Sequence, residues 1–276
     1  MIRFTPVLAF PEMSVGRFDH PCGDRHRDPP SEIAADYSVN LVEQGSFALE
    51  TCEGRWTLRA GDVFVSYPGM EYRCSHDQAM PEDVCFTVAC DGRVRTEEVA
   101  DLERTAREHA ILPPKNRLAY LFHVLASRRD IDSLDIEEAA SAVMAVAGSK
   151  ESAGQKPHGS SQLRWYAERV DAAREHMRRD YAGEQRLVRL ARTVGMSPFH
   201  FARVFRELSG TSPHQFLLGI RLREAAKRLR EGASVTEACY GCGFQNLSHF
   251  SRQFTRRFGV RPSLYSKSQS GGHLAN

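Results

Sequence analysis

A repeat in the last third of the chain restricts its fold more than any other feature. The first copy of the pattern is Phe201-Ala202-Arg203-Val204-Phe205 with Gly210 and Pro213, and the second, 49 residues later, is Phe250-Ser251-Arg252-Gln253-Phe254 with Gly259 and Pro262. A second set of matches precedes each copy at an offset of 48 residues, pairing Leu187, Ala191 and Gly195 with Val235, Cys239 and Gly243. Two copies of one small helical unit are therefore predicted.

The spacing within each copy predicts a helix-turn-helix. A first helix with apolar residues at its first, fourth and eighth positions ends at Gly195 or Gly243, where a tight reversal needs positive φ. In the first copy, Ser197-Pro198 predicts the start of the second helix, with Ser as N-cap and Pro at the first helical position. In the second copy, Ser234 and Glu237 have the spacing of a capping box that begins the first helix of that copy.

The second helix of each copy divides into an inner and an outer face. Helical spacing places Phe201, Val204, Phe205 and Leu208 inside in the first copy. The second copy has Leu247, Phe250, Phe254 and Phe258 as inner residues. Leu247 falls in the first turn, so the pattern leaves open whether it is buried or exposed.

Charge is divided unevenly along the chain. From residue 163 to residue 276 there are 20 Lys and Arg against 9 Asp and Glu, a net charge of +11, whereas the preceding 162 residues carry a net charge of −9. The overall net charge of +2 conceals this asymmetry. A basic domain attached to an acidic remainder is expected when only one part approaches phosphates.

These features together resemble the AraC/XylS family of bacterial transcription regulators. The resemblance covers about residues 165–267 and rests on three segments: Gly195–Phe201, Gly243–Phe254 and Phe258–Pro262. It implies an all-α domain of seven helices in which Pro213–Arg230 forms a basic helix linking two helix-turn-helix units. It also implies that both recognition helices enter successive major grooves of promoter DNA, roughly 34 Å apart.

The resemblance assigns DNA contacts by position. The candidates for base contact are Phe199, Ala202, Arg203, Gln245, Asn246, Leu247, Ser248 and Arg252. The candidates for phosphate contact are Arg206, Arg256 and Arg257. Arginine suits both tasks, because its planar guanidinium can bind guanine O6 and N7 together and its charge attracts phosphate.

Cys239 and Cys242 depart from similar sequences, which usually have Ala and Val at these positions. A Cys-x-x-Cys pair is either a redox dithiol, half of a zinc site, or two small apolar side chains in a core. The inner side of a predicted helix favours the core, and no second Cys-x-x-Cys pair exists to complete a zinc ribbon.

The N-terminal part is predicted to be β structure. Alternating strands are expected at Tyr37–Val42, Ser46–Glu50, Trp56–Leu58, Val63–Tyr67 and Cys85–Ala89, separated by Gly and Pro turns. Short strands of this kind suggest a small barrel or jelly roll. The segment Leu58–Val63 with Pro68-Gly69 resembles the cupin-type sensor barrel of many AraC/XylS regulators, so the fold class is a two-domain α+β chain.

The cupin resemblance raises three alternatives for this part. An enzyme is not expected, because the metal-binding His motif of cupins is absent between His26 and His76, and no cofactor is expected. A soft-metal sensor would need His20, Cys22, His26, Cys74, His76 and Cys85 to come together. The commoner family arrangement is an effector pocket in the barrel, for which the candidate residues are Arg25, Arg27, Tyr37, Glu43 and Tyr72.

Four segments are predicted. Residues 1–95 form the cupin-like sensor, 96–147 a helical segment, 148–162 a small and polar flexible linker, and 163–267 the DNA-binding domain. The helical segment has two apolar stripes, which either form a dimer contact or pack on the barrel. They comprise Leu118, Leu121, Phe122 and Leu125, and Ile136, Ala139, Ala140, Val143, Met144 and Ala147.

The sequence as a whole predicts an effector-responsive transcription activator. Its expected partners are promoter DNA, RNA polymerase, a small-molecule effector and a second copy of the chain. The absence of a signal peptide and of an apolar stretch of about 20 residues predicts a cytoplasmic protein without membrane attachment. Seven cysteines without disulfide-like spacing agree with a reducing compartment.

Overall fold

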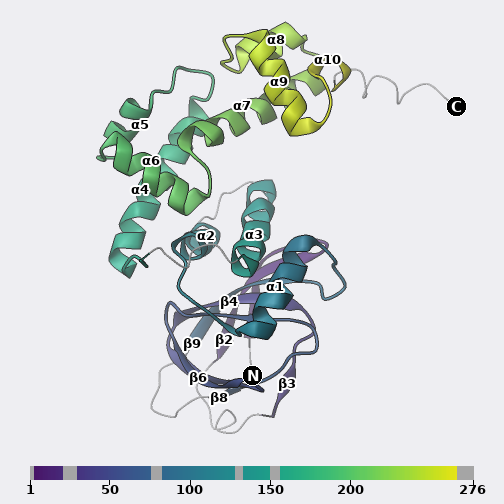
Figure 1. Ribbon diagram of the computed structural model, residues 1–276, viewed down its shortest axis with the longest axis vertical. Helices are drawn as coiled ribbons and strands as arrows, with labels where there is room; N and C mark the ends of the chain where they lie inside the picture. Colours follow the sequence, from purple (N-terminus) through teal and green to yellow (C-terminus); the bar gives the residue numbers. More distant parts are fainter. Residues whose placement is uncertain (1–2, 21–29, 76–82, 128–132, 150–155, 266–276) are drawn as a thin grey trace, which may run out of the picture. The chain divides into compact units, whose positions relative to one another are not determined.

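The computed structural model describes residues 3–20, 30–75, 83–127, 133–149 and 156–265. The chain divides into two compact units, Met1–Leu163 and Arg164–Asn276. The first unit is rich in sheet and the second is helical, so the mixed two-part organisation that the sequence predicted is present (Figure 1).

The strands of the first unit pair antiparallel in two sheets. The larger sheet has the order β1-β2-β9-β4-β7-β10, and the smaller has the order β3-β8-β5-β6. The larger comprises β1 (Arg3–Ala9), β2 (Met13–His20), β9 (Asp83–Cys90), β4 (Tyr37–Gln44), β7 (Val63–Ser66) and β10 (Ile111–Leu112). The smaller comprises β3 (Glu32–Ile33), β8 (Glu71–Ser75), β5 (Ser46–Thr51) and β6 (Gly54–Arg59).

The predicted strands are all present, but a closed barrel is not confirmed. Within the described residues, each strand pairs only inside its own sheet, and no strand pairing joins the two sheets into a ring. The hairpin partners β1 and β2 lie together in the larger sheet, and β5 and β6 lie together in the smaller one. The sequence did not predict β1, β2, β3, β8 or β10.

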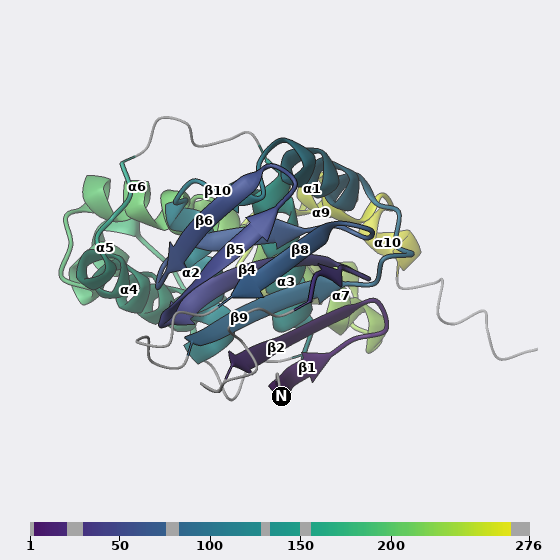
Figure 2. The ribbon, with the colours of Figure 1, turned by 90° about the horizontal axis from the view of Figure 1, so that it is seen from below.

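Three helices cover one face of the larger sheet. These are α1 (Glu97–Glu108), α2 (Asn116–Ser127) and α3 (Ser133–Gly148), and Figures 1 and 2 show them on the side of that sheet away from the smaller sheet. Tyr37 and Val39, which alternate along β4, point into the core between the sheet and the helices. Every residue of the two predicted apolar stripes is buried in this core. The stripes therefore pack inside the unit, which is one of the two alternatives that the sequence left open.

The opposite face of the larger sheet packs on the smaller sheet. Val42 and Cys85 from the larger sheet meet Phe47, Leu49 and Leu58 from the smaller one. Polar side chains on the same face of β4 and the neighbouring β9 bond to each other: Thr87 Oγ1 donates to Asn40 Oδ1 at 2.8 Å, and Asn40 Nδ2 donates to Ser38 Oγ at 2.7 Å. Because Asn40 and Thr87 are buried, these hydrogen bonds offset the cost of removing their polar groups from water.

The second unit contains seven helices among its described residues, as the family resemblance implied. They are α4 (Ser160–Arg179), α5 (Leu187–Thr193), α6 (Pro198–Ser209), α7 (Pro213–Arg230), α8 (Val235–Gly241), α9 (Leu247–Phe258) and α10 (Pro262–Tyr265). Helices α5 and α6 form one helix-turn-helix, and α8 and α9 form the other. Figures 1 and 2 show the two at opposite ends of α7.

The repeated apolar residues form the cores of these two helix-turn-helix units. Phe201 and Phe205 of α6 are completely buried, and so are the equivalent Phe250 and Phe254 of α9. Leu247 is half-buried and packs against the core around α9, which answers the question that its position in the first turn left open. Cys239 and Cys242 are completely buried in the same core, so they act there as small apolar side chains.

Candidate nucleic-acid interface

Turn and cap residues set where α6 and α9 begin. Gly195 and Gly243, which follow α5 and α8, have φ values of 69° and 79°, a left-handed conformation that favours glycine. Ser197 is the N-cap of α6, where its side chain accepts a hydrogen bond from the His200 N–H. Asn246 is the N-cap of α9 and accepts from the His249 N–H at 3.0 Å. Local sequence therefore fixes where each of these two helices starts.

The outer face of α6 carries the predicted contacts of the first helix-turn-helix. Phe199 is 83% exposed, an unusual state for a large aromatic side chain in the first turn of a helix. Arg203 and Arg206 are exposed one and two turns further on, and Ala202, directly before Arg203, is half-buried. The Tyr166 hydroxyl of α4 lies 3.1 Å from His200 Nε2, which ties the start of α6 to its neighbour.

The outer face of α9 carries the predicted contacts of the second helix-turn-helix. Gln245, Ser248 and Arg252 are exposed, as are the phosphate candidates Arg256 and Arg257. Asn246 is exposed too, but its Oδ1 atom is engaged in capping the helix, so only its amide NH2 group remains to meet a base. Leu247 contacts the core, which leaves less of it for DNA than the sequence pattern suggested.

A basic hollow beside α9 contains residues that the sequence analysis missed. It has a volume of about 440 Å³ and is lined by Arg252, Arg256 and Arg261 together with the hydroxyl-bearing Ser251, Thr255 and Ser263. Guanidinium and hydroxyl groups around one hollow can donate hydrogen bonds to phosphate oxygens. Arg261 precedes Pro262 of the repeated motif, so its position at the end of the repeat was the available signal.

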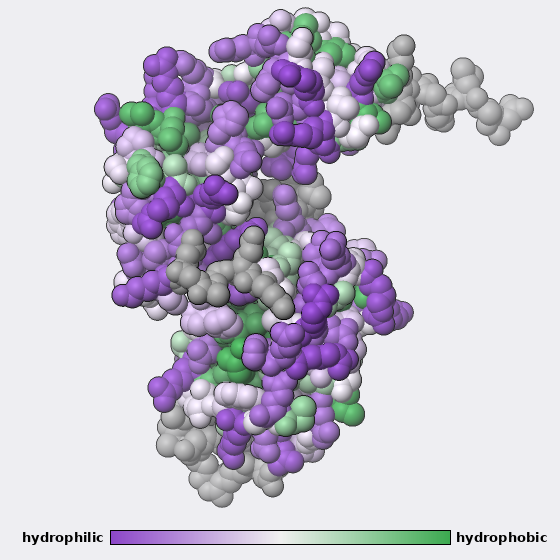
Figure 3. All heavy atoms as spheres, viewed as in Figure 1, coloured by the Kyte–Doolittle hydropathy of each residue, from purple (hydrophilic) through white to green (hydrophobic). Residues whose placement is uncertain are grey.

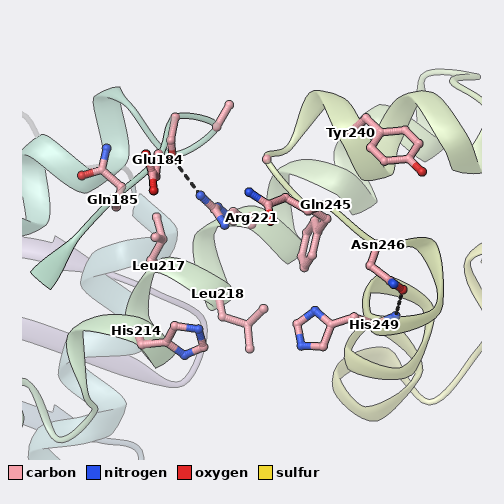
Figure 4. Close-up of a pocket in the computed structure, with 14 residues that line it drawn as sticks. Glu184, Gln185, His214, Leu217, Leu218, Arg221, Tyr240, Gln245, Asn246 and His249 are labelled. Carbon is pink, nitrogen blue, oxygen red and sulfur yellow. Dashed lines mark hydrogen bonds between the residues drawn. The ribbon is translucent and has the colours of Figure 1, made fainter.

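A larger cleft lies between the two helix-turn-helix units. Its volume is about 570 Å³, and its walls come from the segment between α4 and α5, from α7 and from the start of α9. Figure 4 shows His214 of α7 and His249 of α9 pointing toward each other from opposite walls, with Arg221 and Gln245 above them. Two predicted base-contact residues, Gln245 and Asn246, therefore line a cleft as well as an outer face.

The predicted effector-pocket residues do not gather at one place. Tyr37 donates to Glu103 of α1 at 3.0 Å in the helix-covered core, and Glu43 forms an ion pair with Arg17 at 2.6 Å. Tyr72 donates to Glu32 at 3.1 Å and packs near the core between the sheets, where burial raises the pKa of its hydroxyl. Arg25 and Arg27 lie outside the described residues.

The set proposed for a soft metal falls largely outside the described residues. This applies to Cys22, His26, His76 and the side chain of His20. Cys74 and Cys85 are described, and burial raises the pKa of both thiols, that of Cys74 to about 12. In the ranges that the structure describes, no three His, Cys, Asp or Glu side chains are placed to hold a metal ion. Within the same ranges, no helix has the length and apolar character needed to cross a bilayer.

The surface of the second unit is hydrophilic and basic, as expected for a protein that binds a charged polymer. Hydrophilic residues, purple in Figure 3, cover much of the face of this unit that is shown there. All the predicted arginines at positions 203, 206, 252, 256 and 257 are exposed. None of these five takes part in an ion pair described for this unit, so their charges are directed at solvent rather than at carboxylates.

Comparison with known proteins identifies the second unit. A model described as a helix-turn-helix domain matches residues 190–268. A helix-turn-helix transcriptional regulator of Mycobacterium tuberculosis is 36% identical over 86 residues, which are 31% of this chain and 33% of that protein. An uncharacterised helix-turn-helix transcriptional regulator of Haemophilus influenzae is 24% identical over 256 residues, 84% of this chain and 86% of that protein.

A solved structure gives a similar match. The crystal structure of a probable AraC family transcriptional regulator from Rhodopseudomonas palustris is 30% identical to this chain over the aligned part. The match covers 37% of this chain and 97% of that one, with a TM-score of 0.35. The chain spans about a third or less of the length of the first curated relatives that it matches. These relatives are named transcriptional regulators rather than enzymes. The second unit is therefore identified as an AraC-type helix-turn-helix DNA-binding domain.

Proposed function

We propose that this protein regulates transcription by reading two neighbouring segments of a DNA major groove, one with α6 and one with α9. The proposal extends to an effector that changes DNA binding and to activation of transcription. The basic charge of the second unit, its exposed arginines and the names of its relatives support it.

The equivalence of Arg203 and Arg252 carries the proposal. The repeat places these arginines at the same position of the two recognition helices, and both are exposed. Two residues before each is a phenylalanine that is completely buried, Phe201 or Phe250. The same burial thus orients the two helices in the same way, with one arginine on each outer face. A guanidinium presented from a helix in the major groove can bind guanine bidentately.

Selection from random DNA tests this proposal. The full chain is incubated with random-sequence duplexes at physiological salt, and bound duplexes are amplified through several rounds. We expect enrichment of two sequence boxes about one helical turn apart. The double variant Arg203→Ala with Arg252→Ala should enrich neither box, whereas the control Arg104→Ala, in the first unit, should enrich both. Enrichment of no sequence by the unaltered chain would refute the proposal.

The first unit is proposed to sense an effector as a cupin-type domain. Its two packed sheets and the internal polar side chains Ser38, Asn40 and Thr87 support this role, since small-molecule sites combine an apolar wall with a few polar groups. Tyr72 remains a proposed pocket residue because it packs against the core between the sheets, whereas Tyr37 lies in the helix-covered core and Glu43 pairs with Arg17. An effector acts only if its affinity differs between the states of the protein that bind DNA well and poorly. A metabolite that raises the melting temperature and changes the affinity for selected DNA would meet this requirement.

Activation and dimerisation are the remaining parts of the proposal. In a purified transcription reaction, the chain should raise RNA polymerase output from a promoter carrying the selected site. Light scattering of the free chain should give the mass of a homodimer. The apolar stripes of α2 and α3 are buried, so a dimer must use another surface.

A further inference from the structure

The two helix-turn-helix units are joined by more than α7. Residues 180–186 connect α4 to α5, directly before the first helix-turn-helix, yet they reach the second one. We call them the bridging loop. Three of its residues, Tyr181, Ala182 and Gly183, contact α7 or the second helix-turn-helix.

The first contact is between backbones. A Cβ atom built on Gly243 would lie 2.4 Å from the carbonyl oxygen of Ala182 and 2.9 Å from its carbonyl carbon. Side-chain carbons do not approach other atoms so closely, so only glycine allows the turn between α8 and α9 to rest on the bridging loop. The equivalent Gly195 of the first helix-turn-helix has nothing within 4 Å of its Cβ position. The two turn glycines therefore share a backbone conformation but differ in surroundings.

The second contact is made by Arg221 from the middle of α7. Its Nε atom donates to the Tyr181 carbonyl at 2.7 Å and its Nη2 atom donates to the Gly183 carbonyl at 2.8 Å. Figure 4 shows the guanidinium directed across the cleft at the bridging loop. Partial burial lowers the pKa of Arg221, and bonds from a charged donor in such surroundings are stronger than neutral ones.

The third contact is made by Tyr181 itself. Its ring packs against the core of the second helix-turn-helix, the one that contains Phe250 and Phe254. Arg228 of α7 donates from Nη2 to the Tyr181 hydroxyl at 3.4 Å. A residue of the bridging loop, which leads into the first helix-turn-helix, thus contributes to the core of the second.

We propose that these three contacts form a clasp that fixes the distance and rotation between α6 and α9, and thereby sets which spacing between two DNA boxes the protein accepts. Gly243 and Arg221 are then positioning residues. The C-terminal half of α7 already packs into the core of the second helix-turn-helix through Leu222, Ala225, Ala226 and Leu229. The clasp adds contacts on the side of the cleft, between the second helix-turn-helix and the bridging loop. The inference rests on the proposed function, since it assumes that both helices read DNA.

The geometry of DNA makes this clasp measurable. Adding one base pair between two boxes moves them apart by about 3.4 Å and rotates one against the other by about 35°, since one turn takes about 10 base pairs. If α6 and α9 are held rigidly, they can bind both displaced boxes only when the DNA itself twists. If the two helices can move relative to each other, they can bind both boxes without that cost.

The experiment compares spacing rather than affinity alone. Its probe is the two-box duplex that the full chain enriches from random DNA, with the spacer lengthened or shortened by about 1, 2 and 5 base pairs. The unaltered chain should lose about tenfold or more in affinity at each change. Gly243→Ala should bind the original duplex more weakly but differ by about threefold or less among the duplexes with spacers changed by 1 or 2 base pairs.

The equivalent glycine supplies a matched control. Gly195→Ala places the same methyl group at the same kind of left-handed position, so it has a similar backbone cost, but it meets open space. It should weaken binding while keeping the steep dependence on spacing. Arg221→Met leaves both turns intact and should flatten that dependence, whereas Arg230→Met, exposed at the end of the same helix, should not. If Gly243→Ala does not fold, the dependence of affinity on spacer length in Arg221→Met tests the clasp by itself.

The outcomes separate the inference from the proposed function. An unchanged dependence on spacing in Gly243→Ala and Arg221→Met would overturn the clasp and leave the proposed function standing. Equal flattening in Gly195→Ala would overturn it as well. Failure of the unaltered chain to enrich any duplex would instead overturn the proposed function, and the inference with it.

Discussion

The side chain of Asn116 accepts a hydrogen bond from the backbone N–H of His158 at 2.8 Å, 42 residues further along the chain. Its Nδ2 atom also donates to the Lys156 carbonyl at 3.2 Å. The preceding residue, Lys115, donates to the carbonyls of Val146 at 2.8 Å and Ser149 at 2.6 Å. Both ends of the segment predicted as a flexible linker are therefore held at the start of α2. Only Gly159 lies between the held His158 and the start of α4 at Ser160.

Removal of the Asn116 side chain should release this junction. Asn116→Ala removes both hydrogen bonds, so the amide of His158 should exchange with solvent at least tenfold faster. Stability should fall by about 1 to 2 kcal/mol, which corresponds to two hydrogen bonds of ordinary strength. Hydrogen exchange followed by mass spectrometry measures the exchange rate of the His158 amide, and urea denaturation measures the free energy of unfolding. Ser127→Ala, at the other end of α2, should change neither, and an unchanged His158 exchange rate in Asn116→Ala would contradict the assignment.

Arg252 should determine sequence choice. Arg252→Ala should weaken binding to the selected duplex by about 1 to 3 kcal/mol, because a bidentate contact to guanine contributes about that much. Binding to shuffled duplexes should change far less, so the ratio of the two affinities should fall. Competition binding with both duplexes measures that ratio. An equal loss on selected and shuffled DNA would refute base contact by this residue.

Arg256 should act on the DNA backbone instead. Arg256→Ala should weaken binding to selected and shuffled duplexes by a similar factor, since phosphates carry no sequence information. The plot of log affinity against log salt concentration should become shallower by about 1, because one fewer counterion is released. Titrations at several salt concentrations measure the slope. A variant that keeps the full slope would show that Arg256 does not meet a phosphate.

Phe199 should contribute to DNA binding but not to folding. At 83% exposure its ring buries little surface, so Phe199→Ala should leave the melting temperature unchanged. The affinity for the selected duplex should fall about tenfold, equivalent to about 1.4 kcal/mol. Leu264→Ala, which removes another exposed apolar side chain of this unit, should leave affinity unchanged. A large drop in the melting temperature of Phe199→Ala would show a packing role.

The buried thiols should resist chemical labelling. Burial raises the pKa of Cys239 and Cys242, so the reactive thiolate is scarce in the folded protein. Iodoacetamide at about pH 8 should label the exposed Cys52 within minutes and these two only after unfolding. A raised pKa stabilises the fold fully below the usual thiol value of about 8.5, and this contribution disappears as the pH rises through the higher folded-state pKa. Rapid labelling of Cys239 in the native state would reopen a redox role.

Local signals explain what the sequence could predict. Ser197, Ser234 and the prolines at the starts of α6 and α7 act within one helical turn, so the helices begin where the sequence placed them. Asn246 before α9 carries the same signal for an N-cap, yet the outer-face pattern assigned it only to DNA. The repeated phenylalanines gave the inner faces correctly because helical spacing alone decides which residues share a face.

Long-range pairing explains what the sequence missed. Strand β2 pairs with β9 through residues as distant as Met13 and Cys90, and no local pattern specifies that partner. The contact of Arg221 with Tyr181 spans 40 residues and ends on a backbone carbonyl, which every residue possesses. The sequence pattern indicated that the helix containing Arg221 is basic, and nothing in that pattern specifies a contact with the bridging loop.

The ratio of affinities for selected and shuffled duplexes tests the central claim most directly. It is measured with the full chain by competition at physiological salt, where non-specific attraction to phosphates is moderate. Two arginine-bearing helices reading adjacent grooves predict a ratio of about a thousand or more. A ratio near one, with the protein folded and binding both duplexes, would show that the second unit holds DNA without reading it.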